Sequence, residues 1–415
     1  MTQAPPPLPP PPPSPGRPTL PRAIWILGGV SLLMDVSSEM IHGLLPLFLV
    51  DSLGASAFVV GMIEGLGEAT SLVVKVFSGT LSDYLGRRKR LTVLGYGLSA
   101  LTKPLFALAG TVHLVLGARI LDRVGKGIRG APRDALIADI APRELRGAAF
   151  GLRQSLDTIG AFLGPLIAVA LMLAWHDRFR AVFWVAVVPA LLAVVMLELG
   201  VAEPVRPPAA GAVRRNPLRR ESLRQLGGAY WWVVLIGGLA TLARFSEAFL
   251  LLRAQQDGVR VAYVPLVMVA MNVVYSACAY PFGRLADRIS HPRLLAAGLA
   301  VLILADLALA RGRSWPMLAL GVGLWGVHMG ITQGLLAAMV TDAAPAPLRG
   351  TAFGLFNLAS GGAMLVASGL AGWIWSQAGA GYTFYAGATF AALALGAILV
   401  WRPSRPALPE TMLKR

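Results

Sequence analysis

The sequence has a single cysteine, Cys278, among 415 residues, and few charged residues for its length. One cysteine excludes an intrachain disulfide and a cysteine-based zinc cluster. Charged residues make up 14% of the chain and hydrophobic residues 56%, far more apolar sequence than a soluble core of this size requires. Apolar segments of about 20 residues recur between Trp25 and Trp401, long enough to cross a membrane. The composition therefore predicts an all-α, polytopic membrane protein.

The sequence also lacks the motifs of several other protein classes. There is no GxxxxGK[ST] phosphate loop, so ATP hydrolysis by this chain is not expected. There is no HExxH motif and no nucleophile–base constellation, so we predict no enzyme activity, no cofactor and no metal site. A receptor would normally carry a substantial soluble domain, for which the longest linker, 202–229, is too short.

Acidic residues are scarce as well: 21 Asp and Glu stand against 37 Lys and Arg, a formal net charge of +16. In a soluble protein this excess would suggest nucleic acid as a partner. In a membrane protein, Lys and Arg gather in cytoplasmic loops, and the basic runs at 87–90, 143–146 and 206–224 fit that rule. We therefore predict cytoplasmic termini, no nucleic-acid partner, and a monomer in the lipid bilayer of a bacterial inner membrane.

Twelve spans fit the hydrophobic pattern. They are predicted at 23–49, 57–82, 91–109, 112–139, 147–173, 180–201, 230–252, 260–282, 293–310, 315–340, 351–375 and 381–401. The polar, basic segment 202–229 divides them into an N-terminal six-helix half, 22–201, and a C-terminal half, 230–402. A proline tract cannot form a helix or a packed core, so residues 1–21 are predicted to be a disordered cytoplasmic tail, and 403–415 a second tail.

The two halves repeat each other in sequence. ADIAPRELRGAAFGL at 138–152 returns as TDAAPAPLRGTAFGL at 341–355, a shift of 203 residues. GTLSDYLGRRK at 79–89 returns as GRLADRISHPR at 283–293, a shift of 204. Two separate matches at nearly one shift indicate a duplicated six-helix unit. Parallel repeats of this kind occur in transporters that bind their substrate between the halves.

The motifs resemble those of the major facilitator superfamily over residues 22–402. Its signature loop between the second and third helices is matched by Gly79, Leu81, Ser82, Asp83, Gly86, Arg87, Arg88 and Lys89. A fifth-helix motif typical of drug:proton antiporters is resembled by Gly151, Gly160, Gly164 and Pro165. The chain departs from the usual residues at Asp122 and Arg123 and at Ala168-Val169. The resemblance implies two pseudo-symmetric six-helix bundles and secondary transport by alternating access.

The signature loop is predicted to act as a gate. Asp83 stands at a helix end, where it can accept from backbone N–H groups or pair with Arg87 or Arg88. Together with Gly79 and Gly86, and with Asp287 in the second half, it would hold the cytoplasmic side shut and release it as the halves move. The alternative is that the basic run only anchors topology.

The fourth predicted span carries an unusual charged face. Within an arc of about 120° on one helix lie Arg119, Asp122, Arg123, Lys126, Arg129 and Arg133. Charge inside a membrane is costly, so this face should look into a bundle interior or a wet cavity. The alternative is a basic cytoplasmic loop that holds Arg129 and Arg133. Arg119 resembles, by its spacing to Asp139, the fourth-helix arginine of proton-coupled superfamily members.

Three further spans of the first half carry polar stripes. They contribute Asp35 and Glu39 from the first span, Glu64 and Glu68 from the second, and Arg153 and Asp157 from the fifth. Buried carboxylates can exchange protons near neutral pH, so the predicted proton-coupling residues are Asp35, Glu39, Arg119, Asp122 and Asp157. The alternative is a set of structural ion pairs, such as Glu68–Lys75 or Arg153–Asp157. His42 and His328 are predicted to be hydrogen-bonded packing residues and not ligands.

The second half lacks most of this charge. The positions equivalent to the fourth-span charges are apolar or neutral, and Arg244 and Glu247 remain in the seventh span. We predict that the first half handles charge and protons and that the second supplies an apolar wall. The predicted substrate-cavity residues are Arg123, Lys126, Arg129, Glu64, Glu68, Arg153, Arg244, Glu247, Asn272 and Trp325.

The sequence therefore predicts a secondary active transporter of a small organic solute, with proton-coupled efflux. Lys126 and Arg129 have no evident acidic partner in the sequence pattern, so the substrate is predicted to carry a carboxylate or phosphate-like group. The alternative is a symporter that imports an anionic metabolite with protons.

The predicted topology can be tested by cysteine labelling. Single cysteines at Ser222 and Gly312, in a chain that lacks Cys278, should react from opposite sides of the membrane, because the basic linker is cytoplasmic. The measurement is labelling of intact cells with an impermeant thiol reagent. Reaction of the Ser222 site from outside would overturn the topology.

Overall fold

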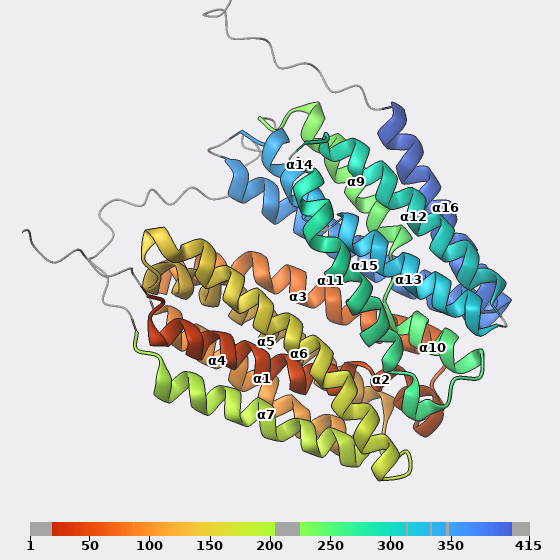
Figure 1. The fold of residues 1–415 in the computed structure, drawn as a ribbon, viewed down its shortest axis with the longest axis horizontal. Helices are drawn as coiled ribbons and strands as arrows, with labels where there is room; N and C mark the ends of the chain where they lie inside the picture. Colours follow the sequence, from red (N-terminus) through yellow and green to blue (C-terminus); the bar gives the residue numbers. More distant parts are fainter. Residues whose placement is uncertain are drawn as a thin grey trace, which may run out of the picture.

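The structure is a computed structural model that describes residues 19–85, 87–203, 225–286, 288–312, 314–332, 334–345 and 348–400. All regular secondary structure in these residues is helical, and Figure 1 shows the helices gathered into two bundles that lie side by side. Most of the predicted tail 1–21, most of the linker 202–229 and all of the tail 403–415 lie outside the described residues. The same holds for Gly86, Asp287 and the side chain of Asp83.

The first bundle contains six long helices. They are α1 (Arg22–His42), continued by α2 (Leu45–Leu47) and a π-helical turn (Phe48–Ser52), α3 (Ala57–Leu85), α4 (Arg88–Leu108), α5 (Val112–Ile140), α6 (Arg146–Ala174) and α7 (Phe179–Gly200). Helix α5 runs without a break through Arg129 and Arg133. The predicted continuous helix is therefore confirmed, and the loop alternative is wrong.

The second bundle is built from helices that are more often interrupted. They are α9 (Gly228–Ala243), α10 (Ala248–Gln256), α11 (Leu266–Ala286), α12 (His291–Arg311), α13 (Trp315–Thr332), α14 (Leu335–Ala343), α15 (Arg349–Ala378) and α16 (Ala380–Val400). The seventh span, predicted as one helix, is broken between α9 and α10, and the tenth between α13 and α14. Gly334 before α14 has φ of +73°, which suits glycine and ends the preceding helix.

Each of the twelve predicted spans corresponds to helix in the structure, so the two-bundle, twelve-helix architecture is confirmed. Eleven helical spans of the described chain are long and apolar enough to cross a membrane. The twelfth, α5, has the length but carries too much charge to qualify by composition alone. A helix of this kind must be shielded from lipid by its neighbours.

Glycines allow the helices of the first bundle to approach closely. A Cβ atom at Gly160 of α6 would lie 2.8 Å from the carbonyl oxygen of Leu32, and one at Gly164 would lie 2.8 Å from that of Val36. These two glycines therefore allow α6 to pack directly on α1. Gly125 of α5 meets Gly95 of α4 in the same way, with a 2.7 Å approach.

The sequence repeat is also visible in a side-chain contact. In the first half, Arg88 at the start of α4 pairs with Asp139 at the end of α5, with Nη1–Oδ2 of 2.8 Å. In the second half, His291 and Asp342 stand 203 residues further on, and their Nδ1–Oδ2 distance is 3.1 Å. A contact between a basic and an acidic side chain thus links α4 to α5 in the first half and α12 to α14 in the second.

The two bundles meet mainly along α3 and α15, with α6 against α11. At one end this contact is very close: a Cβ at Gly372 would lie 2.5 Å from the carbonyl oxygen of Ala57, and one at Gly61 would overlap that of Ser368. At the same end, the Gln255 amide donates to both carboxylate oxygens of Asp51, at 2.8 and 2.9 Å. We call this the closed end.

Toward the other end the same two helices are less tightly joined. A Cβ at Gly354 of α15 would make an ordinary contact of 3.4 Å with the side chain of Val76 on α3. In Figure 1 the bundles lie closest near α2 and α10 and diverge away from them. We call this the open end; the α3–α4 and α11–α12 connections lie there.

Gly312 is unsuitable as a cysteine position for the topology test. Gly312 has φ of +35°, and a side chain there would run into the guanidinium of Arg253. A cysteine at Gly312 would disturb the fold as well as report topology. Ser314, which is exposed in the same connection, is the suitable replacement.

Candidate functional site

A polar cavity lies between the two bundles, toward the open end. It has a volume of about 460 Å³ and is lined from the first half by Asp35, Glu39, Glu68, Lys126 and Asp157, and from the second by Asn272 and Tyr275. A second cavity of about 290 Å³ adjoins it and shares Glu39, Glu68, Lys126 and Asn272. It extends to the break between α9 and α10, where Arg244 and Glu247 line it. Together the two cavities lead from the open end to the middle of the protein.

An ion pair between α5 and α3 lies at the centre of the site. Arg119 Nη2 is 2.6 Å from Glu64 Oε2, and both side chains are buried. The same carboxylate oxygen is 3.6 Å from His42 Nε2 on α1, and His42 Nδ1 is 3.5 Å from Glu39 Oε2. A chain of polar groups therefore runs from Arg119 through Glu64 and His42 to Glu39, which faces the cavity. His42 was expected to be a hydrogen-bonded packing residue, and in the structure its two ring nitrogens face Glu39 and Glu64.

A second ion pair lies beside the first. Arg123 Nη2 is 3.0 Å from Glu68 Oε1, and the Glu68 side chain remains one-third exposed to the cavity. Gly67 makes this arrangement possible: a Cβ there would lie 3.3 Å from the Cγ atoms of both Arg119 and Arg123. The absence of a side chain at Gly67 lets both arginine stems cross α3. The suggested Glu68–Lys75 pair is replaced by this one.

Asp122 on α5 pairs with a lysine of α4 that was not predicted from the sequence. Lys103 Nζ is 3.0 Å from Asp122 Oδ1 and 3.1 Å from Ser38 Oγ. Lys103 and Asp122 are both buried, which makes the pair costly to disrupt from one side only. The sequence signal was a single lysine in the middle of the apolar segment 91–109. Asp122 is thus held in an ion pair and does not line either cavity.

Arg129 and Arg133 turn toward α4 and α1. Arg129 Nη1 donates to Ser99 Oγ at 2.6 Å, and its guanidinium lies 4.7 Å from the centre of the Tyr96 ring. Arg133 Nη1 donates to Ser31 Oγ at 3.2 Å. Arg129 reaches the cavity wall, yet its charged group is held by neighbours, so it is less available for an anion than the sequence suggested.

Five charged side chains line the cavities and form no hydrogen bond or ion pair with any described residue. They are Asp35, Lys75, Lys126, Arg244 and Glu247. Lys126 lines both cavities and is exposed, whereas the neighbouring arginines on α5 are paired or packed. These five groups are the ones that a substrate or a proton can meet without first breaking an existing pair.

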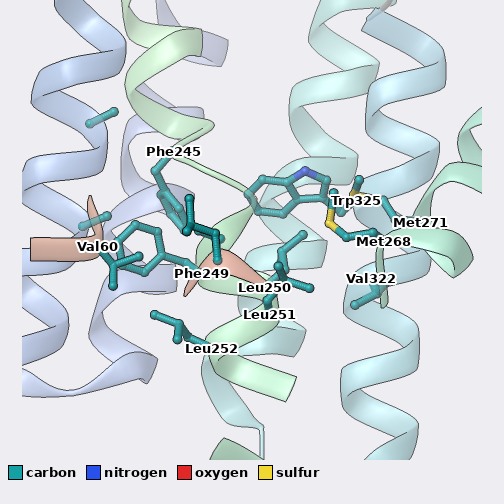
Figure 2. Packing of buried hydrophobic residues seen from close by; sticks show 14 of the residues in the cluster. Val60, Phe245, Phe249, Leu250, Leu251, Leu252, Met268, Met271, Val322 and Trp325 are labelled. Carbon is teal, nitrogen blue, oxygen red and sulfur yellow. The ribbon is translucent and has the colours of Figure 1, made fainter. Parts of the chain in front are cut away.

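Two other predicted cavity residues are Arg153, which is paired, and Trp325, which is buried. Arg153 Nη1 pairs with Asp157 Oδ2 at 2.7 Å, as the ion-pair alternative held. Trp325 is fully buried and lines neither cavity, so its prediction as a cavity residue is corrected. Figure 2 shows its indole between Phe245 on one side and Met268 and Met271 on the other. The indole packs at 5.7 Å from the Phe245 ring.

Only part of the signature loop between α3 and α4 lies within the described residues. Arg88 pairs with Asp139 and also donates to the carbonyl oxygen of Ala135 at 2.7 Å, while Arg87 is exposed. A Cβ at Gly79 would lie 3.5 Å from Ala131 on α5. The predicted roles of Asp83, Gly86 and Asp287 fall outside the described residues. Within the described chain, no group of three or more His, Cys, Asp or Glu is placed to hold a metal ion.

Two six-helix halves with a polar cavity between them are an architecture typical of membrane transporters. Comparison with known proteins identifies the group. The chain belongs to the Major Facilitator Superfamily, whose family model matches residues 27–257 and 233–415. The superfamily predicted from the motifs is thereby confirmed.

Two relatives and one solved structure illustrate the similarity. The chain is 33% identical over 366 residues to an uncharacterized MFS-type transporter of Methanocaldococcus jannaschii, covering 86% of this chain and 89% of the relative. It is 26% identical over 358 residues to the multidrug resistance protein MdtH of Cronobacter sakazakii, covering 85% and 86%. A bacterial homologue of the human lysosomal transporter Spinster shares the fold, with a TM-score of 0.74, 16% identity and coverage of 92% and 98%.

The Lys103–Asp122 pair gives a direct test of the site's electrostatics. Asp122→Leu or Lys103→Met alone should lower the free energy of unfolding by about 3–5 kcal/mol, because each leaves one charge buried without its partner. The double variant Lys103→Met/Asp122→Leu should recover most of that loss. Thermal unfolding of the purified protein in one detergent measures all three. Equal destabilisation by the double variant and by the sum of the two single variants would contradict the pairing.

Proposed function

We propose that the protein is a proton-coupled secondary transporter, and not an enzyme, that exports a small organic solute bearing an anionic group. It would work by alternating access, with the cavity open to the cytoplasm in the state described. The termini and the linker 202–229 would lie on that side of a bacterial inner membrane, in keeping with the basic residues there. The observation that carries the proposal is the free ammonium group of Lys126 at the junction of the two cavities.

An anionic substrate is proposed because two cations of the site are paired with carboxylates and two others are not. Arg119 and Arg123 are bound to Glu64 and Glu68, so neither presents a free positive charge. Lys126 from the first half and Arg244 from the second line the smaller cavity and have no acidic partner among the described residues. Two unpaired cations, one from each half of the protein, favour a carboxylate or phosphate-like group between them. Glu247 beside Arg244 would accept from a donor group on the same solute.

The case for proton coupling rests on Asp35. Its carboxyl group lines the larger cavity and has no hydrogen-bond donor among the described residues, so it can exchange a proton with cavity water. Glu39 lies one turn further along α1 and contacts His42, which contacts Glu64 in turn. A proton taken up at Asp35 or Glu39 would change the charge balance around Lys126 and thereby the affinity for an anion.

Export is favoured over import by the relative whose name is multidrug resistance protein, and by the fifth-helix motif of the sequence. A symporter that imports an anionic metabolite is the second candidate. It is favoured by the arginine-rich face of α5 and by Asp122 and Arg123, which differ from the residues usual in drug:proton antiporters. The direction of net flux separates the two.

The proposal is tested by metabolite profiling of a deletion strain that expresses the protein or a variant. Cells with the parent protein should release more of at least one organic anion than cells with Asp35→Asn or Lys126→Met, and a protonophore should abolish the difference. Lys75→Met is the matched control, because Lys75 lines the larger cavity only and lies on α3.

The results distinguish the alternatives. Depletion of an anion from the medium, dependent on the same two residues, would identify the importer. Transport of a lipophilic cation that is unaffected by Lys126→Met would contradict the anion proposal. Transport that continues unchanged in Asp35→Asn and in the presence of the protonophore would contradict proton coupling.

A further inference from the structure

A carboxyl group in the second half is buried without any polar partner. Asp306, in the C-terminal half of α12, has 0% exposure, and neither of its carboxylate oxygens has a hydrogen-bond partner among the described residues. An ionised carboxylate in such a place would cost many times more than a surface one, since neither water nor a cation compensates it. No role was predicted for Asp306 from the sequence.

The surroundings of Asp306 are aromatic and close-packed. A Cβ at Gly387 of α16 would lie 2.7 Å from Asp306 Oδ2, 3.0 Å from the Phe245 ring and 3.3 Å from the carbonyl oxygen of Ala243. Phe245 in turn packs on Phe384 and Trp325 at 5.6 and 5.7 Å. The carboxyl group therefore has no room beside it for a hydrated ion or an organic solute. A proton is the ligand that fits.

The neighbouring backbone makes this position sensitive to movement. Ala243 is the last residue of α9, and the chain is unwound from Arg244 until α10 begins at Ala248. The carbonyl end of a helix carries partial negative charge, which further disfavours an ionised carboxylate beside it. Discontinuous helices of transporters place coupling ions at such breaks. Asp306 thus lies next to the part of the second half that is best able to rearrange.

Asp306 and Trp325 occupy positions that correspond to a charged pair in the first half. Residue 306 stands 203 positions after Lys103, and Trp325 stands 203 after Asp122, so the two positions correspond to the Lys103–Asp122 pair. In the first half this pair is closed by opposite charges. In the second half the lysine position holds an acid, and the partner position holds an indole whose Nε1 also lacks a hydrogen-bond partner among the described residues. A neutral acid can be accommodated there, whereas a charged one has no counter-ion.

We propose that Asp306 is a second proton-binding group of the transport cycle, in the half that lacks the charged face. This inference rests on the proposed proton-coupled function. In the state described, the carboxyl group holds its proton while Arg244 faces the cavity. When the α9–α10 break rearranges, Asp306 releases the proton to cavity water, and Arg244 becomes the counter-ion of the carboxylate.

The other charged groups around α12 leave this assignment clear. From α9–α10 these are Arg244 and Glu247, which line the smaller cavity. From α13 it is His328, whose Nδ1 is 2.8 Å from the carbonyl oxygen of Gly298 and thus already engaged. Helix α16 contributes no charged residue between Ala380 and Val400. Asp342 on α14 contacts His291 at the open end.

The test is infrared difference spectroscopy of the full-length protein in lipid, as a function of pH and without any transported solute. The parent protein should show the carbonyl stretch of a protonated carboxyl group at neutral pH, slow to shift in heavy water. Asp306→Asn should lose this band. Asp342→Asn, which removes an exposed carboxylate, should keep it. The spectra are recorded in sodium and in choline buffers.

Each outcome is decisive. A band that Asp306→Asn leaves unchanged would overturn the proposal, and so would a band that sodium abolishes, which would assign the site to a metal cation. If Asp306→Asn fails to fold, Asp306→Glu keeps the test available: it retains a carboxyl group and should keep a shifted carbonyl band, and absence of any such band in a folded Glu variant would also overturn the proposal. If the band is lost as expected but efflux ignores a protonophore, the proton site stands and the proposed coupling fails.

Discussion

The cost of taking charge out of water is the constraint on which this structure depends. Helix α5 brings several arginines, a lysine and an aspartate into the membrane, and each ion loses several kcal/mol of hydration there. The surrounding helices compensate at specific atoms: Glu64 on α3 for Arg119, Glu68 for Arg123, and Lys103 on α4 for Asp122. Gly67, Gly95 and Gly125 permit the close approach that these contacts need. What remains unpaired, Lys126 above all, faces the cavity and defines the site.

The two halves of the repeat accommodate buried charged residues in different ways. Both retain the contact at the open end, Arg88–Asp139 and His291–Asp342. Within the helices, the first half has the Lys103–Asp122 ion pair, whereas the corresponding positions of the second half hold Asp306 and Trp325. Trp325 belongs to an aromatic cluster (Figure 2). Ion pairs fix the first half internally, while the second half has broken helices around an apolar core. This difference makes the break between α9 and α10 the natural place for movement relative to a firm first half.

Hydrophobic length and basic loops were sufficient to predict twelve helices, and an internal repeat was sufficient to predict the two bundles. Helix periodicity also put the charges of α5 on one face, because that periodicity is local. It could not say which helix each charge meets: Arg129 reaches the cavity wall as expected, but its guanidinium is held by Ser99 and Tyr96. Lys103 and Asp306 were visible as lone charges in apolar spans and were overlooked. Their correspondence at a shift of 203 would have revealed both. The helix breaks depend on tertiary packing and left no clear sequence signal.

The central claim is that the two halves close alternately around the cavity, and spin-label distances at the two ends test it most directly. One pair of labels at Ser56 and Arg260 reports on the closed end, and another at Arg90 and Ser290 reports on the open end; all four positions belong to exposed connections or helix ends. When the protein in lipid is moved between acidic and alkaline pH, one distance should lengthen as the other shortens. The variant Asp35→Asn should respond less. Distances that stay constant, or that change in the same direction at both ends, would contradict the account.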